Sequence, residues 1–126
     1  SVTRYGKSGP GPEGSVMAAS FELMGQNFAV LNGGPAFKFT EAISFVINCD
    51  TQEEVDTYWE KLSQGGEESR CGWLKDRFGL SWQVVPTILP KLLGDKDSQK
   101  SGRAMQAMLQ MKKLHIPTLQ QAFDGE

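Results

Sequence analysis

The segment from residue 71 to residue 86 constrains the fold of this chain more than any other. Its sequence, CGWLKDRFGLSWQVVP, contains two runs that are typical of β-strands, residues 73–76 and 81–85. Between these runs lies an Asp-x-Phe-Gly turn formed by Asp76 to Gly79, where the glycine can adopt the positive φ that a tight turn needs. The segment therefore predicts two short strands joined by this turn.

Residues 42–63 predict a strand followed by a helix. Residues 42–49 alternate between two different faces, as a strand in a sheet does. Thr51 and Glu54 have the spacing of a capping box, and Gly65 with Gly66 ends the helix. The apolar positions of this helix recur at helical spacing: Val55, Tyr58, Trp59 and Leu62. With a further short strand near residues 68–71, the order becomes strand, helix and three strands.

The first part of the chain predicts three strands in the same relative order, without a preceding strand and helix. These strands cover residues 1–5, 16–23 and 27–31, and Gly25 supplies a hairpin turn between the last two. A chain of 126 residues forms one domain of ordinary size. We divide it into a partial first module (1–34), a connector (35–40), a second module (41–86) and a helical tail (87–126).

The helical tail predicts two helices. One apolar side of the first helix is formed by Ala104, Met105, Met108, Leu109 and Met111. Pro117 lies near the start of the second helix, in which Leu119 and Phe123 are four residues apart. A methionine-rich side is typical of core or dimer packing, so we expect it to contact other parts of the fold or a second copy of the chain.

The order of these segments, together with the Cys-Gly-Trp-Leu and Ser-Trp-Gln-Val-Val-Pro motifs of residues 71–74 and 81–86, resembles the vicinal oxygen chelate superfamily. This superfamily includes glyoxalases, bleomycin-resistance proteins and extradiol dioxygenases. These motifs are most similar to those of its PhnB-like branch, whose members often carry the label demethylubiquinone methyltransferase. The resemblance implies an α+β fold in which paired βαβββ modules form a cupped mixed sheet, here with C-terminal helices and without the first module's opening strand and helix.

The resemblance also implies where a divalent metal would bind. The corresponding positions in this chain are Ala42, Gln83 and the region of Asn32, and a fourth position would precede Ser1. An alanine has no donor atom, and an amide oxygen is a poorer ligand for a transition metal than a carboxylate. We therefore expect no metal and no cofactor, and no histidine ligand from His115, the single histidine.

Alternation along the strands predicts the lining of the cup. If Gln83 points inward, its neighbours two residues away do too, whereas Trp82 and Val84 pack against the helix. The predicted pocket residues are Asn32, Ala42, Ser44, Val46, Asn48, Ser81, Gln83 and Val85. Such a mixed lining suits a small, weakly polar molecule held by hydrogen bonds, or else polar groups that satisfy one another.

Composition restricts the class of function. With 13 basic and 15 acidic residues and no basic cluster, the chain offers no nucleic-acid or membrane surface, and its apolar runs are too short for a membrane span. Two cysteines, Cys49 and Cys71, predict free buried thiols in a cytoplasmic protein.

Three functions remain open. The first is a metal-free protein that binds a small molecule in its cup. The second is a divalent-metal lyase, isomerase or dioxygenase that uses a ligand preceding Ser1, and the third is a drug-sequestering resistance protein. Methyl transfer is not expected, because a nucleotide-cofactor methyltransferase needs a parallel sheet with a glycine-rich turn after its first strand. An uncovered sheet edge and the methionine-rich side together predict a homodimer.

Overall fold

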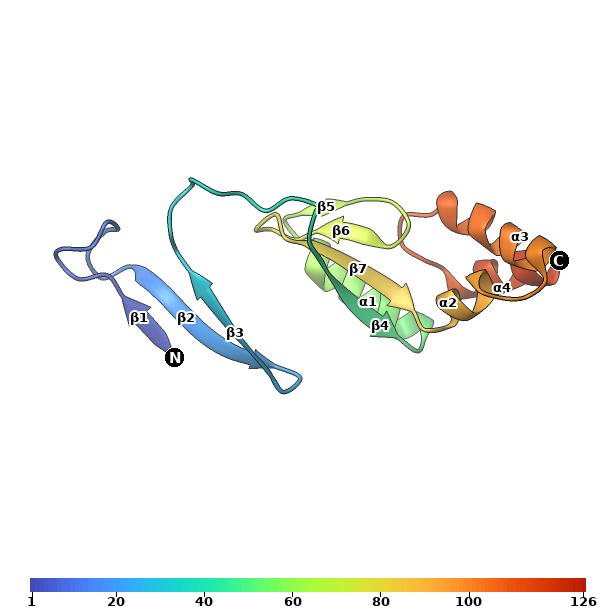
Figure 1. The fold of residues 1–126 in the computed structure, drawn as a ribbon, viewed down its shortest axis with the longest axis horizontal. Helices are drawn as coiled ribbons and strands as arrows, with labels where there is room; N and C mark the ends of the chain where they lie inside the picture. The colour runs from blue at the N-terminus through green and yellow to red at the C-terminus, as the bar shows by residue number, and fades with distance from the viewer. The chain divides into compact units, whose positions relative to one another are not determined.

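The computed structural model describes residues 1–126. It has the expected α+β architecture, with two sheets of different size and four helices (Figure 1). The chain separates into two compact units, Ser1–Lys38 and Phe39–Glu126. The first unit contains a three-stranded sheet, and the second contains a four-stranded sheet and the helices. None of the helices has both the length and the apolar character that crossing a membrane requires.

The first unit is an antiparallel meander of β1 (Val2–Arg4), β2 (Val16–Leu23) and β3 (Gln26–Leu31). Strands β2 and β3 are joined by a two-residue turn whose central residues, Met24 and Gly25, have φ values of 50° and 80°. This conformation is that of a type I′ turn, whose twist matches the twist of the two strands. The predicted hairpin is therefore confirmed.

The second unit has the predicted order of strand, helix and three strands. Its elements are β4 (Ser44–Cys49), α1 (Gln52–Ser63), β5 (Glu67–Glu68), β6 (Trp73–Lys75) and β7 (Ser81–Pro86). The strands lie in the order β4, β7, β6, β5, and β4 runs parallel to β7 while the other pairs are antiparallel (Figure 1). Strands β1, β2 and β3 pair consecutively in their sheet, as β5, β6 and β7 do in theirs.

Four strands, β1, β4, β5 and β6, are shorter than the sequence predicted. Strand β4 begins at Ser44 rather than Ala42. Strand β5 ends at Glu68 rather than near Cys71, because Cys71 and Gly72 both have positive φ values, 57° and 85°. Two successive residues in this left-handed region turn the chain and cannot continue a strand.

Helix α1 starts at the predicted N-cap Thr51 and covers one face of the four-stranded sheet (Figure 1), although Glu54 bonds the amide of Asp50 instead of that of Thr51. The Thr51 hydroxyl accepts a hydrogen bond from the Glu54 amide at 3.1 Å, and the Glu54 carboxylate accepts one from the Asp50 amide. A hydrophobic core lies between α1 and the sheet: Cys49, Val55, Trp59, Leu74 and Val84. Tyr58, which the helical spacing placed in this core, is 43% exposed.

The tail forms three helices instead of two: α2 (Ile88–Leu93), α3 (Ser98–Leu109) and α4 (Ile116–Asp124). Helix α2 was missed because it has only six residues and contains a proline. The three helices share a second core, made of Leu89, Leu92, Ala104, Leu114 and Leu119. Met108 and Met111 pack against this core, whereas Met105 and Leu109 are 40% and 52% exposed, so the methionine-rich side is divided between the interior and the surface.

Candidate functional site

The face of the four-stranded sheet opposite α1 carries most of the predicted site residues. Leu74 and Val84 are buried beneath α1, and Trp82 packs against the same core, so the residues that alternate with them lie on the other face. We call this other face the open face. Its members are Ser44, Val46, Asn48, Trp73, Lys75, Ser81, Gln83 and Val85.

Two of the predicted residues contact each other directly on the open face. The Gln83 side-chain amide donates a hydrogen bond from Nε2 to the Ser44 Oγ at 2.9 Å, across the parallel pair β4 and β7. Gln83 is half-buried, with Val46 and Trp73 opposite it on the neighbouring strands. The bond fixes the amide orientation, so Gln83 Oε1 and the second Nε2 hydrogen are left for other partners.

Ser81 occupies the centre of the next row of the open face. It lies between Ser44 of β4 and Lys75 of β6 in the strand register. Only 1% of Ser81 is exposed, and its hydroxyl Oγ has no hydrogen-bond partner. Because buried polar groups are nearly always hydrogen-bonded, an unpartnered hydroxyl at this position is an unusual feature of the sheet.

A charged pair borders the same row. Lys75 Nζ forms an ion pair with the carboxylate of Glu41, which lies in the turn before β4. The hydrogen bond and the charge of Lys75 lower the pKa of Glu41, and Glu41 raises the pKa of Lys75 in the same way. Both side chains reach solvent, with 38% of Lys75 and 63% of Glu41 exposed, so water screens this pair.

The other predicted site residues have different surroundings. Ala42 lies in an exposed turn before β4, outside the sheet. Val85 packs against the second core near the tail helices, and its strand partner Asn48 is exposed. The structure therefore brings together Ser44, Val46, Ser81 and Gln83 in two adjacent rows of the open face.

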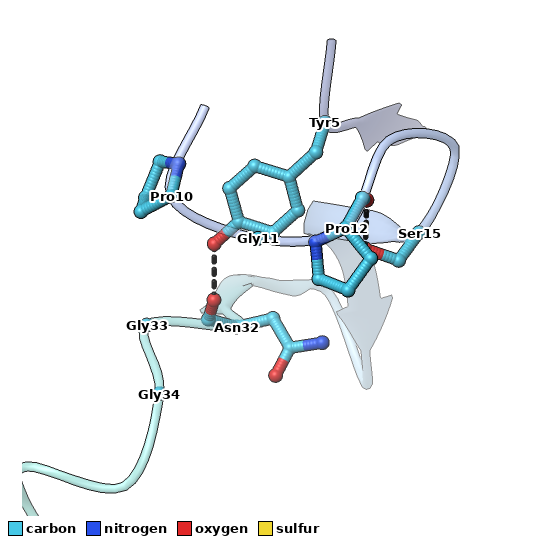
Figure 2. Close-up of a pocket in the computed structure, with 8 residues that line it drawn as sticks. All are labelled: Tyr5, Pro10, Gly11, Pro12, Ser15, Asn32, Gly33 and Gly34. Atoms are coloured by element: carbon cyan, nitrogen blue, oxygen red, sulfur yellow. Dashed lines mark hydrogen bonds between the residues drawn. The ribbon is translucent and has the colours of Figure 1, made fainter. Parts of the chain in front are cut away.

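Asn32 belongs to the first unit and lines a pocket there, with a cavity volume of about 270 Å³ (Figure 2). Its side-chain Nδ2 donates to the Val16 carbonyl at 3.1 Å, and its own carbonyl accepts a hydrogen bond from the Tyr5 hydroxyl. The Tyr5 ring packs closely beneath Gly9 and Gly11, where a Cβ atom would lie 2.7 and 2.4 Å from ring carbons. These contacts hold the loop of residues 6–15 over Tyr5. Asn32, Gly9 and Gly11 therefore have a structural role in this loop.

The residues at the three positions of the implied metal site, Ala42, Gln83 and Asn32, do not fit a divalent transition metal. Ala42 has no donor atom, and Gln83 and Asn32 offer only neutral amide oxygens. No group of three or more His, Cys, Asp or Glu side chains is placed to hold a metal ion. Two neutral amides supply too little negative charge for such a centre.

Neither cysteine has the surroundings of a nucleophile. Burial raises the pKa of the Cys49 thiol, and the nearby carboxylates of Glu54 and Asp50 raise it further. The Cys71 thiol makes a contact of 3.6 Å with the Met108 carbonyl. A reactive cysteine needs a lowered pKa, whereas that of Cys49 is raised, so the Cys49 thiol is a packing residue.

Analysis of the sequence missed the charged members of this region, Lys75 and Glu41. The alternation of β6 contained a signal, because Leu74 is apolar and its neighbours Trp73 and Lys75 must share the opposite face. No sequence signal connected Glu41 with Lys75, because they are far apart along the chain and come together only through the order of the strands.

Comparison with known proteins identifies the family. A family model described as 3-demethylubiquinone-9 3-methyltransferase matches residues 1–85, which is more than half of the chain. The PhnB protein from Bacillus cereus, whose solved structure carries the same methyltransferase description, is 38% identical to the chain. The match covers 69% of this chain and 77% of that protein, with a TM-score of 0.62. The chain belongs to the PhnB-like family.

Two other comparisons add little to this assignment. The crystal structure of protein PA1353 from Pseudomonas aeruginosa is 20% identical, with 63% of this chain and 71% of that chain covered and a TM-score of 0.49. That likeness is too weak to bear on function. No curated protein matches the chain. The PhnB-like assignment agrees with the resemblance in the sequence and with the α+β fold.

Proposed function

We propose that this PhnB-like protein binds a small molecule on the open face of its four-stranded sheet, without a catalytic metal. The hydrogen bond between Gln83 and Ser44 carries this proposal, because it orients an amide on the face of the sheet opposite α1. An oriented amide is pre-organised for binding, so little conformational entropy is lost when a ligand forms hydrogen bonds with it.

The chemistry of these groups defines the ligand class. Gln83 Oε1 accepts a hydrogen bond, and its second Nε2 hydrogen and the Ser44 hydroxyl can donate. Val46 (51% exposed) and Trp73 lie beside Gln83 and offer apolar contact. A small molecule with a carbonyl or amide next to an apolar part matches this arrangement.

The methyltransferase description of the family has no counterpart in this site. A nucleotide-cofactor methyltransferase binds its cofactor at a glycine-rich turn between a parallel strand and a helix. Here β4 is joined to α1 through Asp50 and Thr51, and the Thr51 side chain caps the helix. The backbone at this turn therefore lacks the glycines that allow close approach of a nucleotide.

Nuclear magnetic resonance with acetamide as the probe tests the proposal. We expect acetamide to shift the side-chain amide signals of Gln83 and the backbone signals near Ser44, with weaker binding after Gln83→Leu. Gln64→Leu is the matched control, because Gln64 is an exposed residue at the end of α1. Equal binding by Gln83→Leu, or stoichiometric binding of Zn²⁺ that Gln83→Leu abolishes, would contradict the proposal.

We also propose that the protein acts in the cytoplasm as a homodimer. Its two cysteines are free, which is usual in a reducing compartment. Several large apolar side chains on one face of the sheet in the first unit are exposed, among them Phe21, Leu23 and Val30. A second copy of the chain would bury these side chains, as homodimers commonly do.

A further inference from the structure

Lys75, the strand partner of Ser81 on β6, forms an ion pair with Glu41, which precedes β4. Lys75 lies on β6 and Glu41 lies three residues before Ser44 of β4, while β7 runs between these two strands. In the register of the sheet, Ser81 of β7 stands between Lys75 and Ser44. Ser81 is 1% exposed although it lies on the face of the sheet opposite α1.

We propose that this row is a binding subsite for the carboxylate group of a small-molecule ligand. In this subsite the Lys75 ammonium group neutralises the ligand carboxylate, and the Ser81 hydroxyl donates a hydrogen bond to it. The inference rests on the proposed function, because the rest of the ligand would contact Gln83 and Ser44 in the adjacent row.

Glu41 shows why the ligand group is a carboxylate. Its side chain already places a carboxylate against Lys75, so the position accepts a group of this charge and shape. Glu41 is 63% exposed and lies in a turn, so water can solvate its carboxylate when it leaves Lys75. An exposed ion pair stabilises a protein little, so a ligand can replace Glu41 at low cost.

Ser81 supplies the second, independent observation. Its hydroxyl is buried and has no partner, which is unfavourable for the sheet. Its neighbours have other partners: the Ser44 hydroxyl accepts from Gln83, and Lys75 pairs with Glu41. A ligand carboxylate placed between Lys75 and Ser81 would satisfy the hydroxyl and keep the lysine paired.

Acetate and acetamide distinguish the subsite from the proposed function, because they have nearly the same shape and differ in charge. We expect both to shift the signals of Gln83 and Ser44 in titrations of the full chain followed by nuclear magnetic resonance. Only acetate should shift the signals of Ser81 and Lys75. If both probes act at Gln83 and neither acts at Ser81, the subsite is wrong and the proposed function stands. If neither probe acts at Gln83, the proposed function fails.

Two variants of the ion pair should change the affinity for acetate in opposite directions. We expect Lys75→Gln to weaken acetate binding by at least about fivefold, because a charge-assisted contact is lost. Glu41→Gln should strengthen acetate binding by about twofold to fivefold, because an exposed competing carboxylate is removed. The matched controls, Lys61→Gln and Glu60→Gln, make the same charge changes on α1, on the other side of the sheet.

Ser81→Ala tests the hydroxyl directly. It removes an unpartnered polar group, so the variant should fold normally and bind acetate more weakly while binding acetamide as before. Unchanged acetate binding in Ser81→Ala would show that the hydroxyl does not contact the ligand and would overturn its assigned role. A weaker affinity in Glu41→Gln, or tighter binding of inorganic phosphate than of acetate, would overturn the carboxylate subsite.

Discussion

The Asp76 carboxylate accepts a hydrogen bond from the indole Nε1 of Trp82 at 2.9 Å. Its other oxygen accepts hydrogen bonds from the backbone amides of Phe78 at 2.9 Å and Leu80 at 3.0 Å. One side chain therefore closes the turn between β6 and β7 and also fixes an aromatic ring on the strand that follows. This turn aligns β7, which carries Ser81 and Gln83.

Replacing Asp76 should destabilise the protein strongly. Asp76→Ala removes three hydrogen bonds to a charged acceptor, each of which contributes about 1.5 to 3 kcal/mol when it is intact, although such contributions are not additive. We expect the free energy of unfolding in urea to fall by about 3 kcal/mol. Asp95→Ala, in which one local hydrogen bond from Asp97 is lost, is the control and should change it far less. Similar urea midpoints for the two variants would contradict the role of the turn.

Trp59 and Tyr58 should respond very differently to truncation. Trp59 is 4% exposed and belongs to the core beneath α1, so Trp59→Ala should cost about 3 to 5 kcal/mol. Tyr58 is its neighbour on the same helix and is 43% exposed, so Tyr58→Ala should cost less than about 1 kcal/mol. Urea unfolding followed by circular dichroism measures both, and equal losses would show that the helix is rotated from its assigned position.

These two residues show how far the sequence predicts the fold. Spacing identified α1 and its cap, because both depend on residues close together in the chain. Spacing alone could not show that Trp59 is buried and Tyr58 exposed. The width of the buried side of α1 depends on the small sheet that the helix covers. Similarly, alternation placed Ser44 and Gln83 on one face, but only the strand order brought Glu41 to Lys75.

Stability at low pH should depend on Asp56. The hydrogen bond from Lys113, followed by that from Gln52, lowers the pKa of Asp56 below its ordinary value of 3.8. A lowered pKa in the folded state means that Asp56 stabilises the fold above pH 3.8 and that this contribution is lost as the pH falls through the folded-state pKa. Asp56→Asn should therefore flatten the pH dependence of thermal unfolding below about pH 4. The exposed Asp124, replaced by Asn, is the control. An unchanged pH profile in Asp56→Asn would contradict the ion pair.

Replacement by alanine should destabilise the protein at Gly66 and stabilise it at Gly102. A Cβ atom at Gly66 would lie 2.1 Å from the Lys75 carbonyl oxygen, which is backbone and cannot move aside, so Gly66→Ala should cost about 1 to 3 kcal/mol. Gly102 lies within α3 with no atom within 4 Å of such a Cβ, so Gly102→Ala should stabilise the protein by up to about 1 kcal/mol. Thermal unfolding measures both shifts. A stabilised Gly66→Ala variant would show that β6 does not approach the end of α1 so closely.

The apolar face of the first unit predicts the state of assembly. Phe21 and Phe28 stack with ring centres 5.6 Å apart on this face, where Leu23 and Val30 are also exposed. A small three-stranded sheet gains stability when such a face is covered, so we expect light scattering at micromolar concentration to report twice the chain mass. Val30→Lys should shift the protein toward monomer, because it would bury a charge in the contact. Asn27→Lys adds the same charge on the opposite face of β3 and should leave the dimer intact. A monomer in the unmodified protein, or a dimer that resists Val30→Lys, would exclude this face as the contact.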